Sequence, residues 1–335
     1  MRKSETTKNE MAKQNRITYG MILLTYITVM VLDRAGMLSS LMKGLLVPIC
    51  IYVMLAVSLN LVVGILGELS LGHAGFMCIG AFSGAFFSVC TKGSMPDGLR
   101  FFVALVIGSA MAGMAGVFIG IPVLRLKGDY LAIVTLAFGE IVKNLVNVLY
   151  VKRDGKVIIN GPQGITGTPG DASFTVGVIL VLASLFLVLN LTNSRDGRAI
   201  MAIRDNEIAA QSIGIPVTKY KLLAFTISAS IAGAAGVLYA HNLSTLTALP
   251  KNFGYNMSIM ILVFVVLGGI GNMRGSVIAA VVLTLLPELL RGLSDFRMLI
   301  YAVVLIAMML FHWSPGAIEL REKYSLKRLF GKGEV

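Results

Sequence analysis

Charged residues are scarce in this chain. Asp, Glu, Lys and Arg make up 14% of its 335 residues, while hydrophobic residues make up 56%. Soluble domains carry about 25% charged and roughly 45–50% hydrophobic residues. The chain also contains repeated apolar runs of about 20 residues, which is the length that crosses a bilayer core. The composition therefore excludes an ordinary soluble domain and predicts an all-α, polytopic membrane protein.

Cysteine is also rare. Cys50, Cys78 and Cys90 lie in or beside apolar runs, with no CxxC pair and no histidine at metal-ligand spacing. This pattern argues against a disulfide scaffold and against zinc. We therefore expect no metal site.

Motifs for catalysis are missing as well. The Gly-Lys dipeptides at 155–156 and 331–332 lack the upstream glycine and the following Ser or Thr of a phosphate-binding P-loop. The polar residues of the apolar runs have no nucleophile, second acid or metal-ligand partner at a recognisable spacing. We expect no enzyme and no cofactor, and any ATP must be hydrolysed by another subunit.

Basic residues are in excess, with a formal net charge of +12. They cluster at both termini and in the loop 193–221, which favours a role in membrane orientation over nucleic-acid binding. We expect a cytoplasmic segment 1–16, a membrane domain 17–313 with the cytoplasmic loop 193–221, and a cytoplasmic tail 314–335. No A-x-A-like cleavage site follows Leu32, so the first apolar run is predicted to be an uncleaved span. The expected spans, about ten in number, are 17–32, 44–66, 72–90, 101–124, 130–149, 173–191, 222–241, 257–271, 275–290 and 298–312.

Glycine is common within the spans. Gly80 with Gly84, and Gly116 with Gly120, form GxxxG pairs that are typical of close helix packing. Two longer stretches, "GILGELSLGHAGFMCIGAF" (64–82) and "VLGGIGNMRGSVIAAV" (266–281), each join two apolar segments through a short polar turn. Paired interrupted segments in the two halves of a chain indicate transporter repeats with a pathway between them.

A few ionisable residues fall within or beside the apolar runs. Glu140 and Lys143 are three residues apart on one helix face, which predicts a mutual ion pair and leaves a role in lining a solute path open. Glu68, Ser70 and His73 belong to the first polar turn. Glu68 is either an acid at the cytoplasmic interface or a pathway residue, and His73 either makes a hydrogen bond at a helix start or gates the path.

The stretch "IRDNEIAAQSIGIP" (203–216) predicts a short helix between two spans. Asp205 is expected to be its N-cap and Glu207 to favour the positive end of the helix dipole. Gly214 fits the left-handed position after a helix, and Pro216 prevents continuation. A helix this short is marginal in water, so we expect another surface to hold it.

The chain resembles the permease subunits of bacterial branched-chain amino acid ABC importers in five stretches: "LSLGHAGFMCIGAF" (69–82), "LRLKGDYLAIVTLAFGEIVKNL" (124–145), "NGPQGITGTPG" (160–170), "NSRDGRAIMAIRDNEIAAQSIGI" (193–215) and "LGGIGNMRGSVIAA" (267–280). The similarity runs from about residue 45 to 313 and is closest to the LivM-type subunit. It implies a ten-helix fold of the type II importer kind in the bacterial inner membrane. It also implies a partner permease of the LivH type, two cytoplasmic ATPases, and an external binding protein that delivers leucine, isoleucine or valine.

The resemblance also implies roles for residues. The family's coupling segment carries an E-A-A-x-x-x-G pattern, which Glu207, Ala209, Ala210 and Gly214 match with Ile208 inserted, and Arg204 and Asp205 directly precede it. The turn-rich loop 150–172 is expected to face outward and to receive the binding protein. Its candidate contact residues are Gly161, Gln163, Gly164, Thr166 and Gly167.

Two alternatives stay open at this stage. Importers of urea or short amides use closely similar permease subunits. An ion-coupled secondary transporter would instead use Glu140, Lys143 and Glu68 as an ion relay.

Overall fold

The structure is a computed structural model that describes residues 2–37, 39–126, 128–153 and 156–290, with scattered positions between 299 and 310. It divides into two compact units, 1–281 and 282–335. Most of the expected span 298–312 and the expected tail 314–335 lie outside the described residues.

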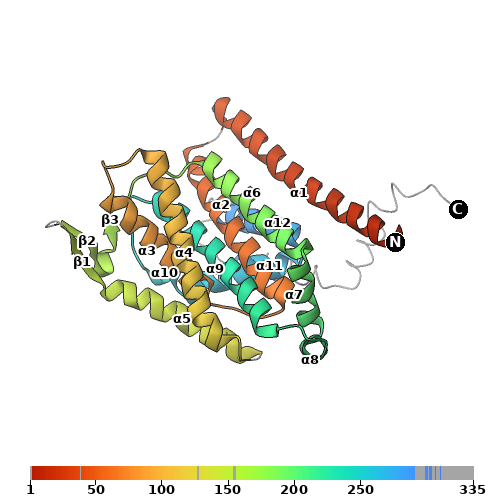
Figure 1. The fold of residues 1–335 in the computed structure, drawn as a ribbon. Coiled ribbons are helices and arrows are strands. Elements are labelled where there is room, and N and C mark those ends of the chain that lie inside the picture. The colour runs from red at the N-terminus through yellow and green to blue at the C-terminus, as the bar shows by residue number, and fades with distance from the viewer. Residues whose placement is uncertain are drawn as a thin grey trace. The chain divides into compact units, whose positions relative to one another are not determined.

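The described chain is mostly helical, and Figure 1 labels its elements in order. Serine or asparagine N-caps begin four of the helices, because Ser39, Ser173, Ser194 and Asn206 each accept a hydrogen bond from a backbone N–H of the first turn. The helices are α1 (Arg2–Arg34), α2 (Ser40–Asn60), α3 (His73–Cys90), α4 (Asp97–Val123), α5 (Asp129–Val148), α6 (Phe174–Asn193), α7 (Arg195–Asp205), α8 (Glu207–Ser212), α9 (Val217–His241), α10 (Pro250–Phe253), α11 (Tyr255–Gly268) and α12 (Met273–Leu289).

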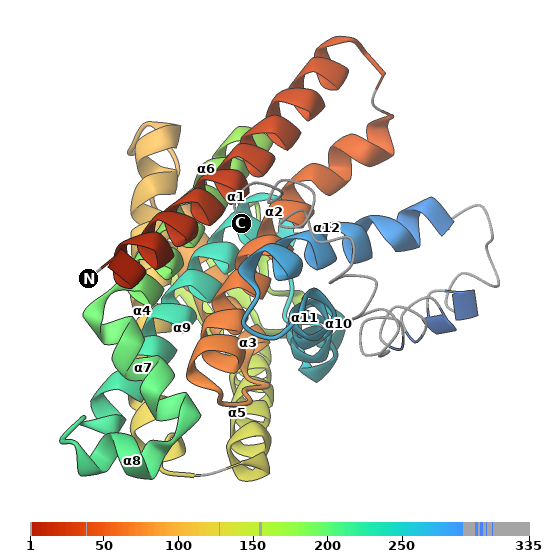
Figure 2. The same ribbon diagram turned by 90° about the vertical axis from the view of Figure 1, so that its right-hand side faces the viewer.

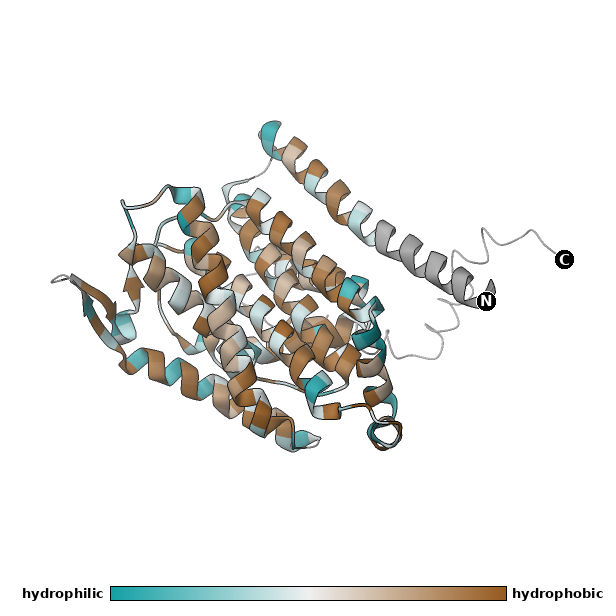
Figure 3. Ribbon diagram, in the orientation of Figure 1, coloured by the Kyte–Doolittle hydropathy of each residue, from teal (hydrophilic) through white to brown (hydrophobic). Residues whose placement is uncertain are grey.

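Seven helical stretches among the described residues are long and apolar enough to cross a membrane. Figure 3 shows apolar residues along these helices and polar residues gathered at their ends and connections. The expected spans 17–32 and 275–290 fall in α1 and α12, which are not among the seven. The count of ten therefore stays a prediction. The seven stretches are Ser40–Leu66, His73–Cys90, Asp97–Val123, Asp129–Val148, Phe174–Asn193, Val217–His241 and Pro250–Gly268.

Small residues bring α3, α4 and α9 into close contact. A Cβ atom added at Gly80 would lie 2.4 Å from Gly233 Cα, and one added at Gly116 would lie 2.8 Å from Ala229 Cβ. Gly108 meets α3 in the same way, since its added Cβ would lie 2.8 Å from Gly80 O. The GxxxG expectation for these helices is confirmed, because the backbones approach at distances that larger side chains would prevent.

A small antiparallel sheet adds strands that the all-α expectation did not include. Its order is β1 (Tyr150–Arg153), β2 (Lys156–Asn160), β3 (Ile165–Thr166) and β4 (Thr245–Leu246). The turn-rich loop forms most of it, with a 3-10 turn η2 (Gly161–Gln163) between β2 and β3. Glycines with positive φ allow these tight reversals. A two-residue strand between glycines has no recognisable alternating pattern, so the sequence could not reveal it.

The short helix of the loop 193–221 begins later than expected. Asp205 is the last residue of α7, and Asn206 caps α8 by accepting a 2.9 Å hydrogen bond from Ala209 N. The prediction of Asp205 as N-cap is therefore wrong. Asn and Asp cap helices about equally well, and α7 extends through Asp205. Gly214 has φ +83°, as its expected place after the helix requires.

Candidate functional site

The first polar turn follows a change of helix type. α2 passes into a π-helix, η1 (Leu61–Leu66), which ends at Gly67 with φ +83°. Residues 67–72 are then non-helical until α3 begins. Single π-helical turns occur frequently at functional sites. The sequence predicted the interruption but gave no sign of the π-helix.

The non-helical residues 67–72 lead into the interior of the bundle. They are followed by His73, the first residue of α3. His73 Nε2 lies 3.0 Å from Ser58 Oγ of α2 and 3.2 Å from Ser228 Oγ of α9. Ser228 is about 16 Å along α9 from its first residue, at 1.5 Å per residue. Non-helical backbone at membrane depth is tolerated only where protein buries it or where it lines a water-filled cavity. Ser70 and His73 are both buried, so protein covers this turn.

The second glycine-rich turn contacts the first. Between α11 and α12, Gly271 N donates a 2.9 Å hydrogen bond to Asn60 Oδ1, and Asn60 Nδ2 donates a 2.9 Å bond to Ser276 Oγ. Asn60 is fully buried at the end of α2. One side-chain amide therefore joins the two interrupted segments that the sequence analysis paired.

A buried cluster of hydroxyl groups surrounds the start of α3. Ala74 N donates to Ser258 Oγ of α11, and Leu71 N donates to Thr135 Oγ1 of α5. Ser70 is fully buried, and its Oγ has no hydrogen-bond partner within the described ranges. His73 lies at a helix start as expected, but its ring hydrogen bonds to serines of other helices.

Glu140 and Lys143 form the predicted ion pair, with Lys143 buried. Glu140 has a second partner, since its Oε1 accepts a 2.7 Å hydrogen bond from Tyr255 N, the first residue of α11. A carboxylate at this place stabilises the positive end of a helix dipole. Glu140 therefore connects α5 to the start of α11, which the local spacing of the pair could not indicate.

The α7–α8 connection reaches the end of η1. Arg204 Nη1 donates a 3.1 Å hydrogen bond to Gly64 O, and its Nε and Nη2 bind Asp205 Oδ1 at 3.1 and 3.0 Å. Figures 1 and 2 show α7 and α8 together at one end of the helical unit. The expected coupling residues and the first interrupted segment therefore share this end.

Two isoleucines project from the α8 region. Ile208 is 74% exposed and Ile213 is 77% exposed, whereas Ala210 is buried and Ala209 is exposed. Within the described part of the chain, both isoleucine side chains are therefore largely uncovered.

Lys221 of α9 is a residue of this site that the sequence analysis missed. Its buried ammonium contacts both Glu68 and Glu207. In the sequence it counted only as one of several basic residues in the loop 193–221. A separation of 153 residues from Glu68 left no local signal of the contact.

The five expected docking residues divide into two groups. Gln163, Thr166 and Gly167 are exposed. Gly161 and Gly164 are buried, and a Cβ added at Gly164 would lie 1.8 Å from Leu246 O. The two buried glycines therefore shape the sheet, and the other three residues are available to a partner.

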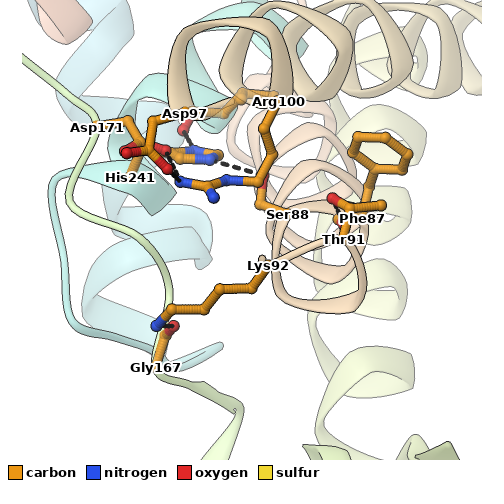
Figure 4. A network of polar contacts seen from close by, with 10 residues as sticks. Phe87, Ser88, Thr91, Lys92, Asp97, Arg100, Gly167, Asp171 and His241 are labelled. Carbon is orange, nitrogen blue, oxygen red and sulfur yellow. Dashed lines mark hydrogen bonds and ion pairs between the residues drawn. The ribbon is translucent and has the colours of Figure 1, made fainter. Parts of the chain in front are cut away.

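A polar network ties this sheet region to the helices, and Figure 4 shows its members. Arg100 Nη2 lies 2.8 Å from Asp171 Oδ2 and 2.8 Å from Asp97 Oδ1. Lys92 Nζ donates to Gly167 O at 3.2 Å. The first contact joins the start of α4 to the residues before α6, and the second joins the residues after α3 to Gly167, which follows β3.

The end of α9 belongs to the same region. His241 Nε2 lies 2.8 Å from Ser88 Oγ of α3 (Figure 4). His241 Nδ1 lies 2.9 Å from Val237 O. Within the described ranges, no three His, Cys, Asp or Glu side chains are grouped so that they could hold a metal ion.

Comparison with known proteins identifies relatives over most of the chain. The family model described as the permease component of branched-chain amino acid transport systems matches residues 41–312. The high-affinity branched-chain amino acid transport system permease protein LivM of Escherichia coli (strain K12) is 36% identical over 320 residues, which cover 85% of this chain and 72% of LivM. No solved structure matches the chain.

More distant relatives are permeases as well. LivH of Escherichia coli (strain K12), from the same kind of system, is 24% identical over 69% of this chain and 79% of LivH. The ribose import permease protein RbsC of Haemophilus influenzae is 27% identical over 76% of this chain and 80% of RbsC.

Proposed function

The chain belongs to the family of permease components of branched-chain amino acid transport systems, and we propose that it forms half of the solute pathway of an ATP-driven importer for leucine, isoleucine and valine. It is a multi-pass inner-membrane transport subunit of a permease pair. The contact of the two interrupted segments through Asn60 carries the proposal for a pathway, because transporters place their solute route at such paired interruptions.

The finer architecture is part of the proposal. We infer a type II importer fold with ten spans, both termini in the cytoplasm, and the divisions 1–16, 17–313 and 314–335. Seven spans and the two interruptions are compatible with this fold.

The proposed partners are a LivH-type permease, two cytoplasmic ATPases and an external binding protein. The ATPase would contact α8 through Ile208 and Ile213, which are the apolar groups exposed there. Ala209, Ala210 and Gly214 keep the segment compact. Arg204 holds it to η1 through Gly64 O, and Asp205 binds the Arg204 guanidinium. The binding protein would contact the sheet at Gln163, Thr166 and Gly167.

The proposed route passes the start of α3. Ser70 and His73 are its candidate polar contacts, since each has a buried polar atom without a partner in the described part of the chain. Glu140 and Lys143 hold α5 against α11 beside this route, and Glu68 lies at its α8 end. The solute would bind weakly here, while alternating access exposes the route to one side at a time.

Uptake by the reconstituted complex tests the function. Liposomes that contain this chain, its LivH-type partner and the ATPases should accumulate labelled leucine, isoleucine or valine when loaded binding protein is outside and ATP is inside. Urea should not be accumulated. Uptake driven by a proton gradient in the absence of the ATPases would contradict the proposal and favour a secondary transporter.

The orientation of the sheet can be tested separately. A cysteine at exposed Gln163 should react with an impermeant thiol reagent in intact cells whose outer membrane has been permeabilised. A cysteine at Gln211 of α8, which is also exposed, is the matched control and should react only after lysis, because we propose that α8 faces the cytoplasm. The reverse labelling pattern would overturn the proposed orientation.

A further inference from the structure

We propose that Lys221 connects α8 to the first interrupted segment, so that a movement of α8 is transmitted to residues 67–72 and the start of α3. This inference rests on the proposed function, because only docking of an ATPase would give α8 a movement to transmit.

The contacts of Lys221 join three separate elements. Its Nζ lies 2.6 Å from Glu68 Oε1, in the residues that follow η1, and 3.3 Å from Glu207 Oε2, the first residue of α8. The exposed fraction of the Lys221 side chain is only 4%, against 15% for Glu68 and 33% for Glu207. One buried cation from α9 is thus shared by two carboxylates that belong to two other parts of the chain.

Burial of Lys221 is the reason why its contacts can transmit a movement. Exposed ion pairs exchange readily with water and contribute little. A buried charge that loses its partner is strongly unfavourable, so the partners tend to stay together when one of them is displaced. If Glu207 moved with α8, Lys221 would follow or would lose a counter-charge in a site that water scarcely reaches, and Glu68 would be affected in turn.

Arg204 supplies a second connection to the same place. Besides its hydrogen bond to Gly64 O, its side chain covers Gly67, where an added Cβ would lie 2.6 Å from Arg204 Cγ. The last turn of η1 and the two residues after it therefore carry contacts from both α7 and α9. From Glu68, only four residues of non-helical backbone lead to His73, which contacts Ser58 and Ser228.

The geometry also changes the role of Glu207. The sequence analysis placed this acid at the positive end of the helix dipole. In the structure it is half-buried and directed to Lys221, while Ile208 and Ile213 are exposed. The apolar side chains would receive the ATPase, and the charged one would pass the displacement inward.

The test uses a reporter at Leu69, which is 37% exposed and adjoins Glu68. The chain carries Leu69→Cys with its three native cysteines replaced by serine, in complex with its permease partner and ATPases. We expect the rate of thiol labelling to change when ATP and vanadate trap the ATPases. The change should disappear in Lys221→Met and persist in Lys221→Arg. Lys219→Met is the matched control, since Lys219 lies on the same helix and is exposed.

Leucine uptake per ATP hydrolysed should fall at least tenfold in Lys221→Met and stay near wild type in Lys219→Met. Should Lys221→Met fail to assemble, Glu68→Gln takes its place, because it keeps the Lys221–Glu207 contact and should show the same loss. The triple reversal Glu68→Lys, Lys221→Glu and Glu207→Lys should restore the ATP-dependent labelling change, which a purely steric role of Lys221 would not allow.

Two outcomes separate the proposals. If Lys221→Met keeps both the labelling change and the uptake per ATP, the connection through Lys221 is wrong while the function stands. The second outcome is that the wild-type complex shows the labelling change and the Lys221→Met complex does not, but the wild-type complex accumulates none of the three amino acids. In that case the substrate proposal is wrong while the connection is supported.

Discussion

Replacing Gly64 by alanine should reduce solute uptake at least tenfold. An added Cβ would lie 2.0 Å from Asn60 Oδ1, 2.4 Å from Gly271 N and 2.7 Å from Gly271 Cα. These atoms are the contact between the two interrupted segments, so the methyl group would separate them or break the Asn60 hydrogen bonds. Overpacking of this kind lowers the free energy of unfolding by about 1–3 kcal/mol. Uptake and thermal stability in detergent measure the two effects.

Gly44→Ala is the matched control for this substitution. Gly44 lies in α2, within the same apolar stretch Ser40–Leu66 that contains Gly64, and an added Cβ there meets nothing within 4 Å. Its uptake and stability should equal those of the wild type. If Gly64→Ala transports as well as Gly44→Ala, the close contact of the two turns has no role in the pathway.

Replacing both Ile208 and Ile213 by aspartate should weaken ATPase binding by roughly a hundredfold or more. Burial of one such side chain contributes about 1.5–3 kcal/mol, and about 1.4 kcal/mol corresponds to tenfold in affinity. The aspartates would also place charges in the contact without partners. Co-purification of the ATPases with the tagged permease measures the loss, and uptake should disappear with it.

Gln211→Asp serves as the comparison for the isoleucine pair. It adds a charge to the same exposed helix without removing an apolar group, so the ATPases should still co-purify. Membrane insertion should be normal in both variants, because neither changes a span. Retention of the ATPases by the double isoleucine variant would show that the docking surface lies elsewhere.

The sequence predicted those elements that depend on local patterns. The apolar runs located α2 to α6, α9 and α11 because a span needs a continuous apolar stretch. The spacing of Glu140 and Lys143 predicted their ion pair because residues three apart share one helix face. An apolar run and a three-residue spacing can each be recognised within the sequence of a single helix.

Contacts between distant segments could not be predicted in this way. Asn60 and Gly271 are 211 residues apart, and Lys221 and Glu68 are 153 apart. Nothing in either local sequence distinguishes these partners from other polar residues near helix ends. The π-helix after α2 was missed for a related reason, since the apolar sequence "LVVGIL" suits either helix type and tertiary contacts decide between them.

α9 carries polar contacts at both of its ends and near its middle. Lys221 lies in its first turns, Ser228 contacts His73, and His241 at its end contacts Ser88. Its 25 residues form a rod of roughly 37 Å. A stiff rod that tilts about its middle moves its two ends in opposite directions. If α9 tilted in this way, a displacement of its Lys221 end would be accompanied by an opposite displacement of its His241 end.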